Sequence, residues 1–465
     1  MNTKNVTENP LGTRPIKSLI WTFAIPGIIT QLVSSLHNIV DQVFLGWGIG
    51  DLGVAATNIV FPITTIITAL SVLIGSGAAA RFSILLGKKQ TNEAVRFLGN
   101  AIALTVSLGT ILLIVTSIFL DPMLYLFGAT DLIMPFAHSY ARIICIGIPF
   151  GIFSTAMAYF IRADGNPNYS SFVLLSGAIF NMVFDPIFLF GFNMGITGVA
   201  IATVLGQVLS TLLAVYYLLK KLKSVPISLK NITVNISVAG TIFSLGAAGF
   251  TTHILNTISQ IVLMNSLKHY GALSIYGSEI VIAAAGAVGK VSMVFLSSVI
   301  GIALGCQPIL GFNLGSKRYD RVKETYLTAL RYGTIIAIVA FLALQLFPKQ
   351  IISIFNSGNP LFYEFAAKYI HIYFAMLFLN AIQPITSNFC TAIGKANLGF
   401  WMALIRQGIL LIPLLLLLPH VLGMNGVLLA GAVSDGVAAM IAIFIARRET
   451  KYLNEEAEKL YISAS

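Results

Sequence analysis

The sequence predicts an all-α integral membrane protein with twelve transmembrane helices in two six-helix lobes. Three observations lead to this fold class. Hydrophobic side chains make up 57% of the 465 residues and charged side chains only 10%, against roughly 25% charged residues in soluble domains. Long stretches such as residues 101–120 and 333–347 are apolar on all sides, as expected of a helix in lipid. An internal repeat relates the two halves of the chain.

Twelve apolar segments lie between polar or Gly/Pro-containing breaks, and a bilayer core takes about 20 such residues per helix. The first segment follows a polar tail that lacks a small-residue cleavage site, so we expect this helix to be retained. The predicted spans are residues 16–46, 52–80, 94–118, 132–160, 168–190, 195–219, 236–266, 279–310, 324–346, 361–390, 396–420 and 424–446.

The basic residues predict how these spans are oriented. Lys and Arg outnumber Asp and Glu by 28 to 17, and 22 of the 28 share one side of the membrane if the N-terminus is cytoplasmic. Only Lys268, Lys349 and Lys368 fall on the other side. Cytoplasmic loops carry such an excess, so we expect a plasma or inner membrane protein with both termini in the cytoplasm. The positive charge is therefore a topological signal, and no nucleic-acid partner is expected.

An internal repeat divides the chain into two halves. GITGV at 195–199 returns as GMNGV at 423–427, an offset of 228 (423 − 195), and Leu86-Gly87 pairs with Leu314-Gly315 at the same offset. Six spans per half predict lobes of parallel topology, related by a pseudo-twofold axis along the membrane normal. The predicted organisation is a cytoplasmic tail at 1–15, an N-terminal lobe at 16–219, a cytoplasmic linker at 220–235, a C-terminal lobe at 236–446 and a cytoplasmic tail at 447–465.

A two-lobed membrane bundle suits alternating access, in which a cleft between the lobes opens to one side and then to the other. An enzyme is not indicated, because the sequence shows no His/Glu cluster at metal-ligand spacing, no Gly-rich phosphate loop and no paired acids beside a nucleophile. A channel is not indicated either, since a repeated selectivity motif is missing. Cys145, Cys306 and Cys390 are far apart and odd in number, so we expect neither disulfides nor a metal cluster.

A few polar side chains lie inside the spans, where a charge costs at least about 2.5 kcal/mol. Asp185 and Asp41 each lie about five residues from the outer end of a span, roughly 8 Å deep. Asn181 precedes Asp185 by one turn, Asn38 precedes Asp41 by nearly one turn, and Thr203 reaches a similar depth. Packed together, these helices would form one polar cluster in which two close carboxylates favour proton binding. The alternative is a hydrogen-bonded pair that only orients helices.

Other residues inside the spans receive supporting roles. Pro26 and Pro186 remove backbone hydrogen bonds and predict hinges in their helices. His37 could join the polar cluster, but a packing or interfacial role is favoured for it. Asp435, in the last span, is assigned equally to helix packing and to transport. Flexible methionines supply adaptable contacts, and the candidates for a substrate cleft are Met157, Met182, Met264 and Met293.

The segment ADGNPNYSSFVLLSGAIFNMVFDPIFLFGFNMGITGVAIATVLGQ, residues 163–207, resembles the multidrug and toxic compound extrusion (MATE) family. The shared features are Gly165-Asn166, the Asn-x-x-x-Asp-Pro motif at 181–186 and the Gly-x-x-Gly-x-Ala motif at 195–200. HNIVDQVFLG around Asp41 and YGSEIVIAAAGAVGK after the seventh helix are also similar to the family. The resemblance covers nearly the whole chain and leans toward the MepA-like bacterial branch.

The resemblance implies export of bulky, often cationic and aromatic compounds, driven by an inward flow of H⁺ or Na⁺. Some members place a Na⁺ site in the C-terminal lobe, but the corresponding segments, 252–264 and 370–389, contain no acid. Coupling by H⁺ at the N-lobe pair is therefore favoured over Na⁺ bound at the same pair. The residues that match the family's ion site, hinge and fourth-helix tyrosine are Asp41, Asn181, Asp185, Thr203, Pro26 and Tyr140.

The sequence as a whole predicts a monomeric secondary antiporter that exports organic cations and drugs in exchange for H⁺, without a cofactor. The rival hypothesis is a flippase for lipid-linked oligosaccharides or peptidoglycan precursors from the same superfamily. Such a flippase would carry several cations facing the cleft, whereas the deep cations expected here are only Arg142, Lys290 and Arg406.

Overall fold

A computed structural model of the chain describes residues 9–353 and 359–464, and all regular structure in these ranges is helical. The elements of the N-terminal half are α1 (Pro10–Thr13), α2 (Ile16–Gly48), α3 (Asp51–Gly87), α4 (Thr91–Ile118), α5 (Leu120–Leu126), α6 (Met134–Ala163), α7 (Pro167–Pro186), the π-helix η1 (Ile187–Gly191) and α8 (Gly195–Lys220). The linker contains the 3₁₀ turn η2 (Leu229–Asn231). The C-terminal half contains α9 (Ile236–Ala272), α10 (Gly277–Gly315), α11 (Tyr319–Leu346), α12 (Pro348–Ile352), α13 (Pro360–Tyr373), η4 (Leu377–Leu379), α14 (Ile382–Ala392), α15 (Ala396–Leu404), the π-helix η5 (Ile405–Leu411), α16 (Ile412–Leu422) and α17 (Met424–Ala464).

The predicted all-α, twelve-span fold is confirmed. In the described ranges, eleven helices are long and apolar enough to cross a bilayer, and the pair Pro360–Tyr373 and Leu377–Ala392 forms a twelfth span bent by 47°. The continuous span expected at 361–390 is therefore broken. The break lies at residues 374–376, where the chain forms a turn between the two helical pieces.

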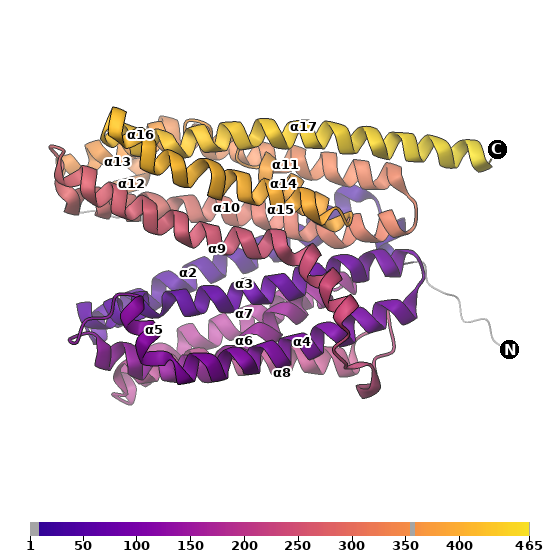
Figure 1. The fold of residues 1–465 in the computed structure, drawn as a ribbon, viewed down its shortest axis with the longest axis horizontal. Coiled ribbons are helices and arrows are strands. Elements are labelled where there is room, and N and C mark those ends of the chain that lie inside the picture. The colour runs from indigo at the N-terminus through magenta and orange to yellow at the C-terminus, as the bar shows by residue number, and fades with distance from the viewer. Residues whose placement is uncertain (1–8, 354–358, 465) are drawn as a thin grey trace.

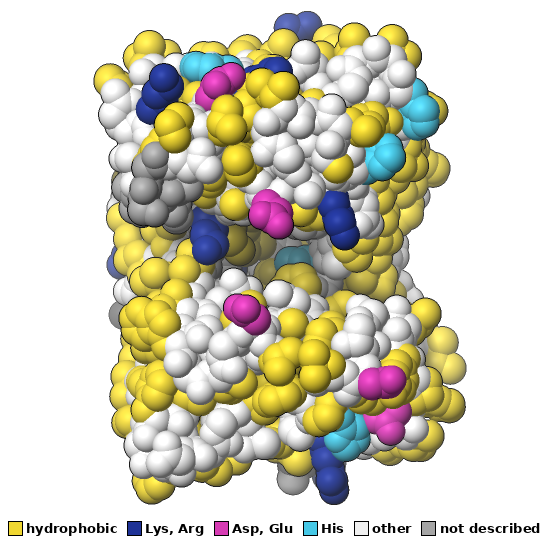
Figure 2. Space-filling view, turned by 90° about the vertical axis from the view of Figure 1, so that its left-hand side faces the viewer, with side chains coloured by type: hydrophobic (Ala, Val, Ile, Leu, Met, Phe, Trp, Pro, Cys, Tyr) yellow, Lys and Arg dark blue, Asp and Glu magenta, His cyan; other side chains and the backbone are white. Residues whose placement is uncertain are grey.

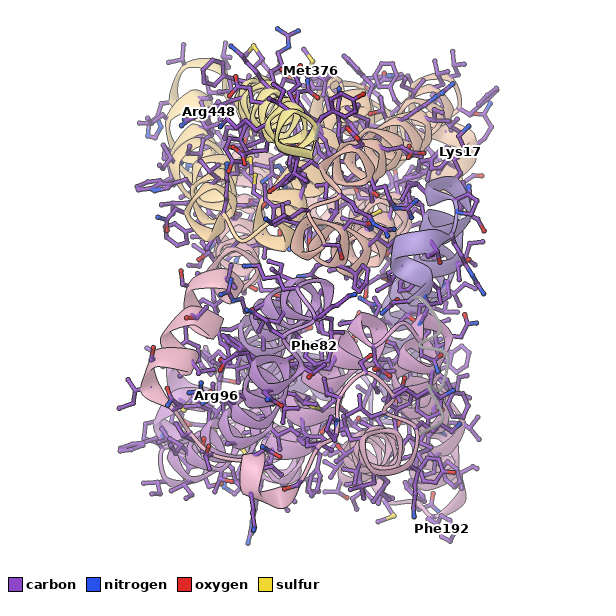
Figure 3. The ribbon with its side chains drawn as sticks, turned by 90° about the vertical axis from the view of Figure 1, so that its right-hand side faces the viewer. Lys17, Phe82, Arg96, Phe192, Met376 and Arg448 are labelled. Atoms are coloured by element: carbon purple, nitrogen blue, oxygen red, sulfur yellow. The ribbon has the colours of Figure 1, made fainter. Side chains whose placement is uncertain are left out.

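The helices form two stacked lobes, with the N-terminal half below and the C-terminal half above in the view of Figure 1. Phe82 and Arg96 lie in one lobe and Met376 and Arg448 in the other (Figure 3). The described chain begins and ends at the same end of the bundle, which we call the terminal face. The opposite end, which carries α5 and α12, is called the distal face.

The internal repeat also appears in the helix boundaries. The helices α4 and α11 begin at Thr91 and Tyr319 and end at Ile118 and Leu346, so both of their ends are related by the offset of the sequence repeat. The preceding helices, α3 and α10, end at Gly87 and Gly315, which the same offset relates. Each half also has a π-helical segment in its fifth span, η1 in the N-terminal half and η5 in the C-terminal half. The two halves are thus repeats in structure as well as in sequence.

The first helix of each half packs partly with the other half. Ile16, Ile20 and Phe23 of α2 lie in a hydrophobic cluster built mainly from α10, α11, α14 and α17. In the same way, Val238 and Ile242 of α9 lie in the core of the N-terminal half. This exchange ties the lobes together near the terminal face.

Close backbone contacts close the terminal half of the lobe interface. A Cβ added at Gly87 would lie 2.1 Å from the carbonyl oxygen of Phe312, and one at Gly315 would lie 2.0 Å from that of Ile84. Only residues without a Cβ allow α3 and α10 to approach so closely. Gln307 adds a hydrogen bond across the interface, from Nε2 to the carbonyl oxygen of Ser76 at 3.1 Å.

The distal face is open between the lobes. Figure 2 shows this face hollowed along the line where the two halves meet, with charged side chains at its rim. With a hollow at the distal face and a close backbone contact at the terminal face, the two-lobed bundle is open toward the distal face.

We expect Gly246→Ala, on α9, to lower the free energy of unfolding by about 1–3 kcal/mol, the usual cost of overpacking. A Cβ at this position would lie 1.8 Å from the carbonyl oxygen of Leu73 on α3, so the two helices would have to separate. Denaturation of the full chain in detergent measures this change. The matched control is Gly240→Ala, on the same helix, where nothing lies within 4 Å of the added Cβ. Equal effects of the two substitutions would contradict the close contact.

Candidate functional site

Four helices of the N-terminal half converge around Asp185, near the distal end of the lobe. Asp185 is the penultimate residue of α7, and α7 packs against α2, α6 and α8. The side chain of Asp185 is fully buried, and Asn181, one turn earlier, is only 2% exposed. A carboxylate buried in this way requires polar partners.

Asn181 links α7 to α8 through its side-chain amide. Its Nδ2 donates to Oδ1 of Asp185 at 3.0 Å and to Oγ1 of Thr203 at 2.9 Å. The hydroxyl of Thr203 in turn donates to the carbonyl oxygen of Val199 at 3.0 Å. The structure thus brings together Asn181, Asp185 and Thr203, three of the four residues that the sequence placed in one cluster.

Asp41 of α2 is the fourth member of the cluster, and its carboxylate interacts with that of Asp185. Its side chain is 18% exposed, so Asp41 lies between the buried carboxylate and the accessible surface. Tyr140 of α6 completes the group, because its hydroxyl lies beside Thr203 and near both aspartates. The cluster therefore joins α2, α6, α7 and α8.

The partner of Asp41 on its own helix is His37. Nδ1 of His37 lies 3.1 Å from Oδ1 of Asp41, although the pair lacks hydrogen-bond geometry. His37 thus lies beside the cluster, the alternative that the sequence left open, and its role stays a prediction. Asn38, expected to accompany Asp41, is exposed and donates from Nδ2 to the carbonyl oxygen of Ser34 at 2.9 Å. The i, i+4 spacing of His37 and Asp41 is the sequence signal that should have identified the histidine.

Three acceptor oxygens of this cluster are buried without a hydrogen-bond donor among the described residues. They are Oδ2 of Asp185, Oδ1 of Asn181 and Oδ1 of Asp41. Orphaned acceptors of this kind are costly unless a proton or a cation binds there. Among the described residues, no three His, Cys, Asp or Glu side chains group as metal ligands. The arrangement is suited to binding one small positive charge.

The helix beside Asp185 is locally distorted. The α-helical geometry of α7 ends at Pro186, and the chain continues as the π-helix η1. Proline cannot donate to the carbonyl one turn earlier, and π-helical turns are frequent at functional sites. Pro26, by contrast, lies within α2, which remains a single helix from Ile16 to Gly48. The hinge roles of both prolines stay predictions.

The methionines proposed for a substrate cleft lie in different surroundings. Met157 has 0% exposure and lies in the core of the N-terminal lobe, so its assignment to the cleft was wrong. It lies on α6, which other helices of its lobe cover on several sides. Met264 packs against a core cluster of the C-terminal lobe. Met182 is half-buried, and Met293 is 42% exposed, so these two remain candidates.

The C-terminal lobe holds a different polar group, centred on Asp435 of α17. Nη2 and Nε of Arg406 donate to Oδ1 of Asp435 at 2.8 and 2.9 Å. Nδ2 of Asn380 donates to Oδ2 at 2.7 Å. Arg406 lies in the π-helix η5, and its carbonyl oxygen accepts from Oγ of Ser434 at 2.8 Å. Asp435 is thus neutralised by a cation of the protein itself.

The sequence matches the MatE family model over residues 26–187 and 250–417, which together cover more than half of the chain. The chain belongs to the MatE family, a family of membrane transporters, and the predicted resemblance is confirmed.

Curated relatives and solved structures extend this comparison. The chain is 25% identical to the multidrug export protein MepA of Staphylococcus aureus over 433 residues, covering 93% of each chain. It is also 25% identical to MepA of Staphylococcus saprophyticus, covering 91% of this chain and 92% of the relative.

Among solved structures, an outward-facing multidrug resistance MATE family transporter superposes with a TM-score of 0.89 at 21% identity, covering 97% of this chain and all of that one. A MOP superfamily transporter from Pyrococcus furiosus gives 0.88 at 21% identity, covering 96% and 98%. These superpositions support the twelve-helix, two-lobed fold.

We expect Arg406→Gln to lower the free energy of unfolding by about 3 kcal/mol, because it leaves the Asp435 carboxylate buried without its cation. The double variant Arg406→Gln with Asp435→Asn removes both charges and should restore most of the stability. Denaturation in detergent and substrate transport are measured on the same variants. A stable double variant that has lost transport would contradict a purely structural role for the pair.

Proposed function

We propose that the chain exports organic cations and other drugs in exchange for H⁺ by alternating access. Membership of the MatE family and the names of the MepA relatives support drug export. The binding of H⁺ is assigned to the pair Asp41 and Asp185. The substrate is a small molecule, and the protein is an integral membrane protein.

The observation that carries the coupling proposal is the burial of Asp185. Its Oδ1 accepts from Asn181, while its Oδ2 has no donor and lies in the low-dielectric interior of the lobe. A proton on Oδ2 would remove the charge and supply the missing hydrogen bond. The carboxyl group therefore has two states of different charge, which a coupling site needs.

The distribution of charge supports an external distal face. Lys88, Lys89, Lys317 and Arg318 gather at the terminal face, which the excess of basic residues assigns to the cytoplasm. In this orientation, the hollow in Figure 2 opens to the outside. Protons from outside would reach the partly exposed Asp41 before the buried Asp185.

In the proposed cycle, the substrate occupies the cleft while the aspartates are deprotonated. Protonation from outside neutralises the pair, so Asp41 and Asp185 lose their electrostatic attraction for a cationic drug. The helix beside Asp185 is already irregular at Pro186, so a change in its packing needs few broken backbone bonds. Release of the drug then precedes return of the empty cleft.

Na⁺ is the second candidate for the coupling ion. The three donor-free oxygens of the cluster are hard ligands, the type that Na⁺ also prefers. H⁺ is favoured because one proton satisfies Oδ2 of Asp185 without the further ligands that a metal ion needs.

The flippase hypothesis fits the site less well. A pyrophosphate-linked lipid would need cations free to face the open cleft. Arg406, one of the deep cations expected from the sequence, is instead bound by Asp435. Arg142 is exposed, and Lys290 is half-buried, so only two of the three expected cations are left for such a role.

We expect Asp185→Asn and Asp41→Asn to reduce ethidium efflux driven by a pH gradient in everted vesicles by about tenfold or more. An amide cannot take up the proton, so the step that the gradient drives is lost. The proton and Na⁺ gradients are collapsed separately. Glu279→Gln, an exposed acid at the start of α10, is the control and should transport like the wild type.

Three results would change the proposal. Undiminished efflux in both aspartate variants would exclude the pair as the coupling site. Loss of wild-type efflux only when the Na⁺ gradient is collapsed would replace H⁺ by Na⁺. Binding of an undecaprenyl-linked precursor without any drug efflux would favour the flippase.

A further inference from the structure

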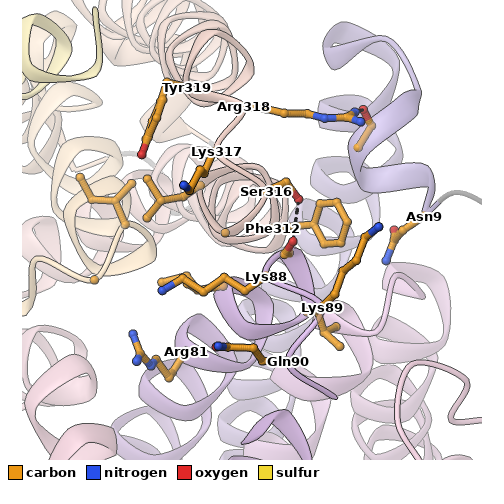
Figure 4. Close-up of a pocket in the computed structure, with 18 of the residues that line it drawn as sticks. Asn9, Arg81, Lys88, Lys89, Gln90, Phe312, Ser316, Lys317, Arg318 and Tyr319 are labelled. Carbon is orange, nitrogen blue, oxygen red and sulfur yellow. Dashed lines mark hydrogen bonds between the residues drawn. The ribbon is translucent and has the colours of Figure 1, made fainter. Parts of the chain in front are cut away.

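A large cavity lies between the two lobes at the terminal face, remote from the aspartate cluster. Its volume is about 1410 Å³, and its walls come from the ends of α3 and α10, the loops that follow them and the loop before α15. The lining is completed by Asn9, Gly12, Thr13, Ser224, Tyr452 and Leu453. Figure 4 shows side chains from both lobes projecting toward this space.

The described lining of this cavity carries cations and no carboxylate. The cations are Arg81, Lys88, Lys89, Lys317, Arg318 and Lys395.

Two of these cations already have partners within the protein. Arg318 donates to the carbonyl oxygen of Gly12, and Lys395 forms an ion pair with the buried Glu449 of α17. The other four have no ion pair with any described residue, and Nε of Arg81 is buried without a hydrogen-bond acceptor. These four cations are therefore available to donate hydrogen bonds to an anion.

The two lobes contribute to the cavity in equivalent ways. Lys89 and Lys317, which the repeat places at equivalent positions, both adopt the left-handed conformation, with φ of +59° and +58°. This conformation is uncommon for residues other than glycine and fixes the turn after α3 and after α10. The first residues of α4 and α11, Thr91 and Tyr319, also line the cavity, and N-terminal N–H groups add positive potential there.

This arrangement brings like charges of the two lobes to the place where the lobes are in contact. Ser316 of one lobe donates to the carbonyl oxygen of Gly87 in the other at 3.0 Å. In Figure 4, Lys88 and Lys317 project on the same side of this closed contact, whereas Lys89 projects on the other side, toward Asn9. Their repulsion opposes closure of the terminal face. An anion bound between them would remove this repulsion and join the lobes.

We propose that this cavity binds a phosphate-bearing anion that bridges the two lobes and favours the state closed at the terminal face. Lys and Arg are the side chains that bind phosphate oxygens. A volume of about 1410 Å³ exceeds that of a single phosphate, so a diphosphate or a lipid headgroup fits this space. Both sources present the same chemistry, and neither depends on the proposed drug export.

The experiment uses the full chain and two probes. Sodium pyrophosphate is titrated into protein in neutral detergent, and nanodiscs of phosphatidylcholine are compared with nanodiscs that also contain phosphatidylglycerol. Thermal unfolding reports binding. Spin labels at Leu126→Cys and Ile275→Cys, exposed positions on the two lobes, report the distance between the lobes at the distal face.

We expect at least one probe to stabilise the wild type and to enrich the population with long distances at the distal face. In the triple variant Lys88→Gln, Lys89→Gln, Lys317→Gln, the apparent affinity should fall by about tenfold or more, because charge-assisted contacts to phosphate are lost. The control removes three exposed cations outside the cavity, by Lys220→Gln, Lys223→Gln and Arg448→Gln. Should the triple variant fail to fold, Lys88→Gln alone is used, since Lys88 has an ordinary φ of −74°.

The outcomes distinguish the sources and the proposal itself. An effect of pyrophosphate in detergent supports a soluble anion, and an effect confined to phosphatidylglycerol nanodiscs supports a lipid headgroup. No response of the wild type to either probe, or an equal response of the triple variant, would overturn the site. Binding without a change in the distance distribution would overturn the bridging role. An equal effect of chloride at matched ionic strength would show that salt only screens the repulsion between the lysines, which would overturn a phosphate site.

Discussion

The backbone contact between α3 and α10 at the terminal face is the constraint on which the remaining arrangement depends. Gly87 and Gly315 let these helices touch without intervening side chains, and α2 and α9 cross from one half to the other beside them. Since the contact occupies only one end of the interface, the lobes diverge toward the distal face. The open hollow there follows from this asymmetry.

The two lobes share a fold, but their buried acids have different hydrogen-bond and ion-pair partners. In the N-terminal lobe, Asp185 has an amide partner and an oxygen without a donor. In the C-terminal lobe, Asp435 has the guanidinium of Arg406 and the amide of Asn380. A carboxylate that is ion-paired with a cation of the protein has a lower affinity for a further proton or cation. The two lobes thus share a helix pattern, while their buried acids lie at positions that the repeat does not relate.

The same repeat concentrates charge. The turn after α3 and the turn after α10, which the repeat relates, both line one cavity at the terminal face. Charges that are scattered along the sequence become neighbours across the lobe interface. Their mutual repulsion acts on the backbone contact between α3 and α10 that closes the terminal face.

The sequence alone determined that the chain lies in a lipid bilayer, how many helices cross it, that the chain is a repeat, and which residues form the N-lobe cluster. These results rest on the length of apolar segments, a constant offset between matching motifs and one-turn spacing, which are local or periodic properties. Asn181 and Asp185 were predictable as neighbours for that reason. Only the tertiary structure decided that His37 rather than Asn38 accompanies Asp41, that Met157 lies in the core, and that Arg406 neutralises Asp435. These outcomes depend on helix rotation and on contacts between spans distant in sequence, which hydropathy does not encode.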